Sequence, residues 1–376
     1  MRGTRVCALL MALIASPAPS SAEGISTPRT LPAFQHAEGA PDCRAPPGLR
    51  RVLAFAQDND RQFMQGVAAG LAAAARDRGL EFEILRAAND PELMVTQVRE
   101  ARAQAVGALV AAPINAASLS PAIKELIRSG AYVGSIVAPP ATSILNAPQY
   151  RTGQVLAEAA RSYIEKSLRG KARVVLLTHD SNQFLAQRFV AMRHVFAQMP
   201  GVTLVADISP VTVNKQGGYE TMKKIMIAHT HIDVVLGADT VVLGALAAMR
   251  EAGRTNRLQF FGGIDGEPEA LAELMKGQEY RATISLASPV FAYAMGHHAA
   301  DWLEGRPVPQ AMDILPTSLT RDNIAQYEAD SRDPAAVWRD AARRDRYLTM
   351  YGRICYDTRD QFLDFPWSSE RRPAQP

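Results

Sequence analysis

The chain has 376 residues, of which 47% are hydrophobic and 21% are charged, and its formal net charge is +3. This length and apolar content are sufficient for one large or two medium hydrophobic cores. The small positive excess is not gathered in any one segment, so we expect neither a nucleic-acid partner nor a membrane-surface partner.

The N-terminus has the layout of a secretory signal peptide. Arg2 and Arg5 form a short basic start, residues 6–15 (VCALLMALIA) are apolar, and residues 16–22 (SPAPSSA) are mostly small. This pattern predicts a signal peptide at 1–22 that is cleaved, so that the mature chain is exported. The alternative, an N-terminal anchor, is disfavoured because the apolar run is too short to span a bilayer.

Two cysteines, Cys43 and Cys355, remain after removal of that segment. In an oxidising compartment such a pair often forms a disulfide, and we expect this bond here, with two free thiols as the alternative. A zinc site needs closely spaced Cys or His ligands. The pair His229 and His231 lacks a third ligand at a suitable spacing, so we expect no metal site.

Short apolar segments alternate with amphipathic ones from residue 51 onward, after an extended leader at 23–49 that is rich in Pro, Ser, Ala and Gly. Strands are predicted at 51–57, 81–87, 107–112, 131–137, 143–146, 173–178, 202–209, 232–237, 258–264 and 281–286. Helices are predicted at 61–78, from 91 onward, and at 117–129, 152–168, 184–198, 217–229, 240–252, 268–276 and 289–305.

The alternation of apolar strands with helices predicts parallel sheets that are covered by helices on both faces. The units are too many for one compact sheet, so we expect two doubly wound α/β lobes. The chain after about 318 is charged and helix-prone, then aromatic and proline-rich. We expect a helical tail that packs on the second lobe, with Trp338, Tyr347 and Tyr351 as docking contacts.

Signatures of an enzyme are absent from the sequence. The chain has no Gly-x-Ser-x-Gly motif, no Walker loop and no Gly-x-Gly-x-x-Gly after the first strand. The turn at 262–266 (GGIDG) resembles a phosphate cradle, but Asp265 within it opposes an anion. We therefore expect a protein that is not an enzyme and that uses no cofactor.

Ligands of open α/β sheets bind beyond the carboxyl ends of the parallel strands. This rule nominates residues that directly follow predicted strands in both lobes. For Asn115 and Asp239 helix capping is an alternative role, because both stand where a cap is expected. The nominated ligand contacts are Asn59, Asp60, Arg61, Phe63, Asn115, Ile136, Val137, Gln183, Asp239 and Asp265.

Several segments, among them VGALVAAPIN, DVVLGADTVVLGALAAMREAG, FFGGIDGEPEALAEL and YRATISLASP, resemble type I periplasmic binding proteins of the ribose/galactose-binding group. The resemblance covers about 50 to 320. Regulators of the lactose-repressor type share this core. They begin with a helix-turn-helix, whereas this chain begins with the signal-peptide pattern, so the regulator interpretation is disfavoured.

The resemblance implies two lobes that are joined by a three-segment hinge and close around a small-molecule ligand. It also implies a periplasmic monomer that delivers its ligand to an ABC permease. Hinge crossings are expected near 148–150, 287–288 and 313, which adds Tyr150 and Ser288 to the ligand contacts. The implied divisions are lobe one at 50–148 plus 288–313, lobe two at 149–287 plus 314–330, and the helical tail at 331–376.

Most positions that hold sugar hydroxyls in this group differ here, although Asp265 is retained and Arg188 lies close to an expected arginine. An unpaired buried polar group costs about 1–3 kcal/mol, so a simple pentose or hexose is disfavoured. We expect a larger or less polar ligand. The positions that differ are Ala112, Ile136, Val137, Ala186, Ala238 and Leu286.

A second function remains open, that of a periplasmic sensing subunit that controls a membrane histidine kinase or a chemoreceptor. Ligand-sensing members of the same fold use the two lobes in this way. A hydrolase is disfavoured, because no nucleophile and base can be paired in the sequence.

Overall fold

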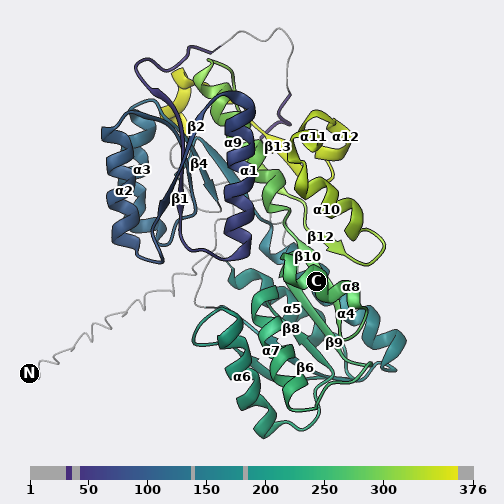
Figure 1. The fold of residues 1–376 in the computed structure, drawn as a ribbon. Helices are drawn as coiled ribbons and strands as arrows, with labels where there is room; N and C mark the ends of the chain where they lie inside the picture. The colour runs from purple at the N-terminus through teal and green to yellow at the C-terminus, as the bar shows by residue number, and fades with distance from the viewer. Residues whose placement is uncertain (1–30, 36–42, 137–139, 181–184, 363–376) are drawn as a thin grey trace, which may run out of the picture.

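The computed structural model describes residues 31–35, 43–136, 140–180 and 185–362. Two α/β lobes lie one above the other in Figure 1, each with a sheet flanked by helices. The two-lobe fold expected from the sequence is confirmed. The predicted signal peptide at 1–22 lies outside the described residues.

Lobe one is built on a seven-stranded sheet in the order β13-β11-β5-β4-β3-β1-β2. Neighbouring strands run parallel, except that β13 is antiparallel to β11. The strands are β1 (Arg50–Gln57), β2 (Glu81–Arg86), β3 (Val106–Ala111), β4 (Tyr132–Ile136), β5 (Ser143–Asn146), β11 (Ala311–Ile314) and β13 (Leu348–Tyr351).

Lobe two is built on a six-stranded sheet in the order β12-β10-β9-β8-β6-β7. Here too the neighbouring strands run parallel, except that β12 is antiparallel to β10. The strands are β6 (Ala172–Leu177), β7 (Val202–Ile208), β8 (Val234–Leu236), β9 (Phe260–Asp265), β10 (Tyr280–Ser285) and β12 (Thr317–Leu319).

The helices are α1 (Gln62–Arg78), α2 (Pro91–Ala103), α3 (Ala116–Arg128), α4 (Gln149–Ser167), α5 (Ala186–Ala197), α6 (Lys215–Ala228), α7 (Asp239–Glu251), α8 (Pro268–Lys276), α9 (Ser288–Leu303), α10 (Ile324–Arg332), α11 (Pro334–Arg339) and α12 (Ala341–Arg344), with a 3-10 helix, η1, at Tyr356–Phe362. Along β1, Leu53 and Phe55 pack in the same core as α1 and α9, whereas Val52 and Ala54 pack with α2 and α3. Alternate side chains of a strand face opposite sides, so an apolar strand is buried on both faces.

Among the described helices, none combines the length and the apolar character needed to cross a bilayer.

The chain passes between the two sheets at three places, as expected for a three-segment hinge. β5 of lobe one leads into α4, which packs in the core of lobe two. β10 of lobe two leads back into α9 of lobe one, and β11 of lobe one leads into β12 of lobe two. The tail adds a fourth passage, because β12 belongs to lobe two and β13 belongs to lobe one.

The tail packs on lobe one, so the expectation that it packs on the second lobe is wrong. β13 pairs with β11, which would otherwise present unpaired backbone groups at the edge of the sheet. Trp338 of α11 lies against His297 and His298 of α9, with ring centroids 4.8 and 5.2 Å apart. Tyr351 forms a bridge with Ala33 of the leader. These aromatic residues are docking contacts, but they dock on the other lobe.

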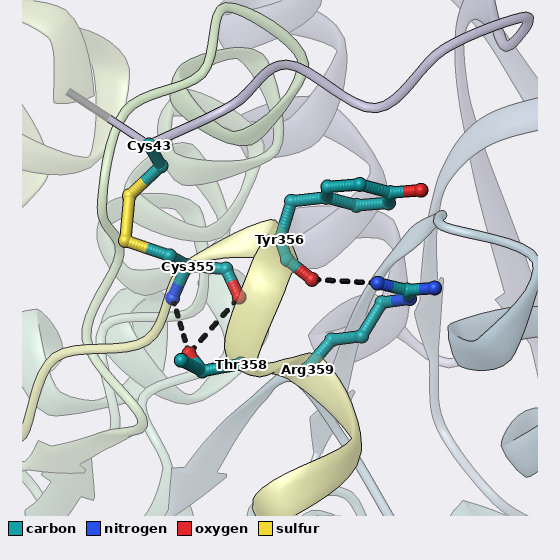
Figure 2. The surroundings of a disulfide bond; sticks show 5 residues. All are labelled: Cys43, Cys355, Tyr356, Thr358 and Arg359. Atoms are coloured by element: carbon teal, nitrogen blue, oxygen red, sulfur yellow. Dashed lines mark hydrogen bonds between the residues drawn. A yellow bond between two sulfur atoms is a disulfide. The ribbon is translucent and has the colours of Figure 1, made fainter.

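A disulfide joins Cys43 and Cys355, as the sequence predicts, and their Cα atoms are 5.4 Å apart. Figure 2 shows Cys355 beside η1, where its backbone N–H donates to Thr358 Oγ1 at 3.1 Å. The bond links residues that are 312 positions apart in the sequence. It therefore fixes the leader to the tail on lobe one.

Candidate functional site

A loop of polar residues follows β1 at the end of lobe one that faces lobe two. The Asp58 carboxylate accepts hydrogen bonds from the backbone N–H and the side-chain amide of Asn59, both at 2.7 Å. Asn59 Oδ1 accepts from the backbone N–H of Arg61 at 3.0 Å and from its Nε at 3.1 Å. Burial raises the pKa of Asp58, and the Arg61 guanidinium opposes this rise. The loop thus holds the Arg61 side chain in a defined position.

The first turn of α1 is held against α9. Phe63 is half-buried, and its ring centroid lies 6.0 Å from that of Phe291 on α9. The buried Ser288, at the start of α9, lies so close to Gly66 that a Cβ at position 66 would overlap its hydroxyl. Arg61 precedes the helix and provides no side-chain cap, so the first N–H groups of α1 lack a partner from their own loop.

The lobe-two side of the site is built around Asp265, the last residue of β9. Its φ of 123° lies in a region that favours glycine, so the backbone is strained at this point. Arg188 of α5 is 4% exposed, and its Nη1 lies 4.0 Å from Asp265 Oδ1. Arg188 Nε also donates to Gln149 Oε1 at 2.8 Å. Burial raises the pKa of Asp265, and the charges of Arg188 and Arg61 oppose this rise.

Asp239, at the start of α7, is fully buried beneath the site, and its carboxylate is enclosed by donors. It accepts hydrogen bonds from Tyr280 Oη (2.6 Å), Thr283 Oγ1 (2.8 Å) and the backbone N–H of Glu267 (2.9 Å). Gly263 permits this arrangement, because a Cβ there would overlap Asp239 Oδ1 and the Tyr280 hydroxyl. Burial, followed by the charge of Asp265, raises the pKa of Asp239 to about 7. Asp239 therefore orders the floor of the site from inside.

Glu267, between β9 and α8, is a residue that sequence analysis did not nominate. It is 4% exposed, and its Oε1 is buried without a hydrogen-bond partner. Burial, followed by the charges of Asp265 and Asp239, raises its pKa to about 8. Arg61 and a hydrogen bond from the backbone N–H of Phe63 act in the opposite direction. The Glu267 side chain thus reaches from lobe two to the first turn of α1 in lobe one.

Arg61 connects the two sides of the site electrostatically. Burial, followed by the charges of Arg61 and Arg188, lowers the pKa of His179 after β6. Arg61 also opposes the burial-driven rise in the pKa of Asp265 and of Glu267. His179, Asp265 and Glu267 all belong to lobe two, whereas Arg61 belongs to lobe one. The fold therefore brings together groups from both lobes at their junction.

Other nominated residues lie apart from this group or are already engaged. The Asn115 side chain is exposed, and its Oδ1 caps α3 by accepting from the backbone N–H groups of Ala117 and Ser118 at 3.0 and 3.1 Å. Tyr150 Oη lies 3.1 Å from His194 Nδ1. Asp60 is exposed, and Ile136 is half-buried at the end of β4. Val137 and Gln183 lie outside the described residues.

A group with the spacing of metal ligands lies elsewhere, on α9 below the tail, and comprises His297, His298 and Asp301. Arg78 occupies the position that a cation would need, since its Nη2 lies 3.0 Å from Asp301 Oδ1. Its Nη1 also lies 2.8 Å from His297 Nε2. This group therefore binds the neighbouring guanidinium and holds α9 to α1.

A family model described as a periplasmic binding protein domain matches residues 52–307 of this chain. A protein of Rhizobium meliloti that is provisionally assigned as rhizopine-binding is 24% identical over 265 residues. The matched segment is 66% of this chain and 83% of that protein.

Solved structures of solute-binding proteins share the fold. An ABC transporter periplasmic solute-binding protein from Actinobacillus succinogenes 130z, with bound D-allose, superimposes with a TM-score of 0.67 at 18% identity, covering 73% of this chain and 99% of that chain. An ABC transporter solute-binding protein from Bacillus halodurans C-125, with bound myo-inositol, gives 0.66 at 18% identity, covering 75% and 98%.

Proposed function

This chain belongs to the periplasmic binding protein domain family, and on that basis we propose that it is the solute-binding component of an ABC-type uptake system. Its two lobes close around one small ligand at their junction and then dock on the permease. The observation that supports this function best is the position of Arg61. It belongs to lobe one, yet its charge acts on His179, Asp265 and Glu267 of lobe two.

Closure requires that the ligand contact both lobes, because only a differential contact shifts the equilibrium towards the closed form. Arg61 and Phe63 supply the lobe-one side, and Arg188 and Asp265 supply the lobe-two side. The chain before residue 23 acts as the signal peptide and directs the mature protein to the periplasm. The hinge follows the divisions implied by the sequence, with lobe one at 50–148 plus 288–313.

The class of ligand is a small polyhydroxylated molecule with at least one apolar face, which is more sugar-like than the larger or less polar ligand expected from the sequence. Two solved structures of the same fold contain D-allose and myo-inositol. In lobe one, however, the half-buried Ile136 and the buried Ala112 cannot bond hydroxyl groups. An apolar wall of this kind suits the C–H face of a ring, while the polar groups of lobe two bind its substituents.

Ligand binding to the mature chain, residues 23–376, tests this function. Native mass spectrometry identifies any ligand retained through purification, and isothermal titration calorimetry measures the affinity for that compound. Small-angle X-ray scattering should then show a decrease in radius of gyration on binding. Absence of any small-molecule ligand, or binding without compaction, would contradict the proposal.

Arg61→Ala should weaken the affinity at least about tenfold, since a charge-assisted contact to the ligand is lost. Arg99→Ala is the matched control, because Arg99 lies exposed on α2 away from the junction. Equal loss in both variants would show that Arg61 has no specific role in binding.

A further inference from the structure

Carboxyl groups outnumber guanidinium groups at the junction of the lobes. Four acidic side chains gather there with two arginines, Arg61 and Arg188, and the fourth of them, Asp239, is coupled to the others through Asp265 and Glu267 rather than through an arginine. His179 adds no positive charge near neutral pH, because its pKa is lowered by burial and by both arginines. The site therefore has an excess of potential negative charge. The acidic residues are Asp58, Asp239, Asp265 and Glu267.

Both guanidinium groups already have acceptors of their own. Arg188 interacts with Gln149 and Asp265. Arg61 donates to Asn59 and lies beside Asp58. Neither arginine forms an ion pair with Glu267 among the described contacts. Glu267 is therefore the carboxyl group of this cluster whose charge, when ionised, would be least compensated.

Glu267 is fixed in place but incompletely bonded. Its backbone N–H donates to Asp239 Oδ2 at 2.9 Å, which holds the loop between β9 and α8. Its side chain is 4% exposed and extends towards Phe63 in the other lobe, with Oε1 lacking a partner. A buried carboxyl oxygen without a partner is costly, and a donor that also brings positive charge both bonds this oxygen and stabilises the ionised form of the group.

We propose that the ligand is a hydroxylated primary amine, such as an amino sugar or an aminocyclitol, and that Glu267 and Asp265 bind its ammonium group. This inference rests on the proposed function and names the ligand of the same site. An ammonium group has three N–H donors and one positive charge. A hydroxyl group has one donor and no charge, so it would satisfy Oε1 but leave the excess of carboxylates unchanged.

The proposal predicts that binding releases protons. Without ligand, the raised pKa of Glu267 keeps its carboxyl group largely protonated at pH 6.5. A bound ammonium favours the ionised form, so Glu267 loses its proton when the amine binds. A neutral sugar that binds in the same place releases none.

The test is isothermal titration calorimetry of the mature chain at pH 6.5, in two buffers that differ in ionisation enthalpy. The probes are D-glucosamine with D-glucose, D-galactosamine with D-galactose, and an amino-deoxyinositol with myo-inositol. We expect at least one amine to bind about tenfold or more tightly than its neutral counterpart and to release up to one proton per ligand.

Glu267→Gln separates the role of this carboxyl group from general effects on the fold. The variant should lose most of the preference for the amine and should release no proton on binding. Glu269→Gln is the control, since Glu269 lies two residues further on, is exposed and forms an ion pair with Lys215. It should behave like the wild type.

Binding of a neutral sugar in preference to every amine would overturn this inference and leave the solute-binding function in place. An unchanged amine preference in Glu267→Gln would also overturn it. If none of the probes binds and the purified protein retains no ligand, both the inference and the proposed function fail.

Discussion

Two clusters of buried charge in this protein have opposite electrostatic character. On α9, the carboxylate of Asp301 lies 3.0 Å from Arg78. Burial raises its pKa, but the hydrogen bond from His297 and the nearby His298 outweigh burial and hold the pKa of Asp301 well below the usual range. At the lobe junction, burial and neighbouring carboxyl groups raise the pKa of Glu267 to about 8. The first cluster is compensated within the fold, whereas the second is not.

The comparison distinguishes charged groups that stabilise the fold from charged groups that remain available to bind a ligand. The Asp301 cluster joins α1, α9 and the tail, and each of its acidic groups has a basic neighbour. The junction cluster leaves an excess of carboxyl groups at a place that both lobes reach. Titratable groups that meet at such a place with strongly perturbed pKa values mark a candidate functional site.

The largest effect is expected from Asp239→Ala, which removes the acceptor beneath the junction cluster. The Tyr280 hydroxyl, the Thr283 hydroxyl and the backbone N–H of Glu267 would lose their buried partner. We expect a loss of about 4 kcal/mol in the free energy of unfolding. Urea unfolding followed by circular dichroism measures it. Asp239→Asn keeps an acceptor oxygen and should lose much less, whereas an unchanged midpoint for Asp239→Ala would contradict the interpretation.

Asp301→Asn should have the next largest effect, because it removes the more buried of the two ionic partners of Arg78, which is 14% exposed, and leaves only Glu304. We expect a loss of about 3 kcal/mol at pH 7. The folded-state pKa of Asp301 is depressed, so its contribution is present above the usual pKa near 4 and disappears as the pH falls. Because this contribution is lost in acid, the free energies of unfolding of the wild type and the variant should converge at low pH. Tryptophan fluorescence during urea unfolding measures them, since Trp302 and Trp338 lie beside this cluster.

Glu267 should contribute to stability with the opposite pH dependence to Asp301, and Glu267→Gln should remove that contribution. The folded-state pKa of Glu267 is raised to about 8, so the wild type loses stability as the pH rises from about 4.5 through about 8. The variant cannot ionise and should be more stable than the wild type by at least about 1–2 kcal/mol at pH 8.5, a conservative part of the roughly 4–5 kcal/mol that the whole pKa shift would give. At pH 5 the difference should be below about 1 kcal/mol. Thermal unfolding at both pH values measures the change. A variant less stable than the wild type at pH 8.5 would indicate that the carboxylate is compensated after all.

The smallest effect is expected from Asn115→Ala, at a neutral site outside both clusters. The substitution removes the cap of α3 and should cost about 1 kcal/mol in stability at any pH between 5 and 8. Ligand affinity, measured by calorimetry, should not change. A clear loss of affinity would instead support the sequence-based prediction that Asn115 contacts the ligand.

The fold was largely predictable because local sequence patterns determine most of its strands and helix ends. β3 (VGALVA) is buried at every position, as a strand covered by helices on both faces must be, and Gly79 ends α1 in the left-handed conformation. The position of the tail was not predictable in this way. The four residues of β13 have no distinct local signal, and their pairing with β11 follows from an open sheet edge that exists only in the folded lobe.

The site was predictable in part, through the rule that ligands bind at the carboxyl ends of strands. That rule nominated the ends of β1 and β9, and the fold brings Arg61 and Asp265 from these two ends within electrostatic range of each other. It did not nominate Glu267, whose burial depends on α1 from the other lobe. The sequence offered only its position directly after the Gly-Ile-Asp-Gly turn. Nor does the sequence distinguish Asp239, which supports the site from within, from a residue that reaches the ligand.

The pairing of β13 with β11 has a consequence for the order in which the protein can fold. Lobe one contains the first strands to be synthesised, but its sheet also needs residues 348–351, and its disulfide needs Cys355. The disulfide joins residues 312 positions apart, and β11, on which β13 pairs, itself pairs with β5 from the first half of the chain. Contacts of such sequence separation form slowly. Among the described strands, β12 is the last in the sequence that belongs to the sheet of lobe two, so that sheet can be complete earlier. The lobe that is begun first is therefore finished last.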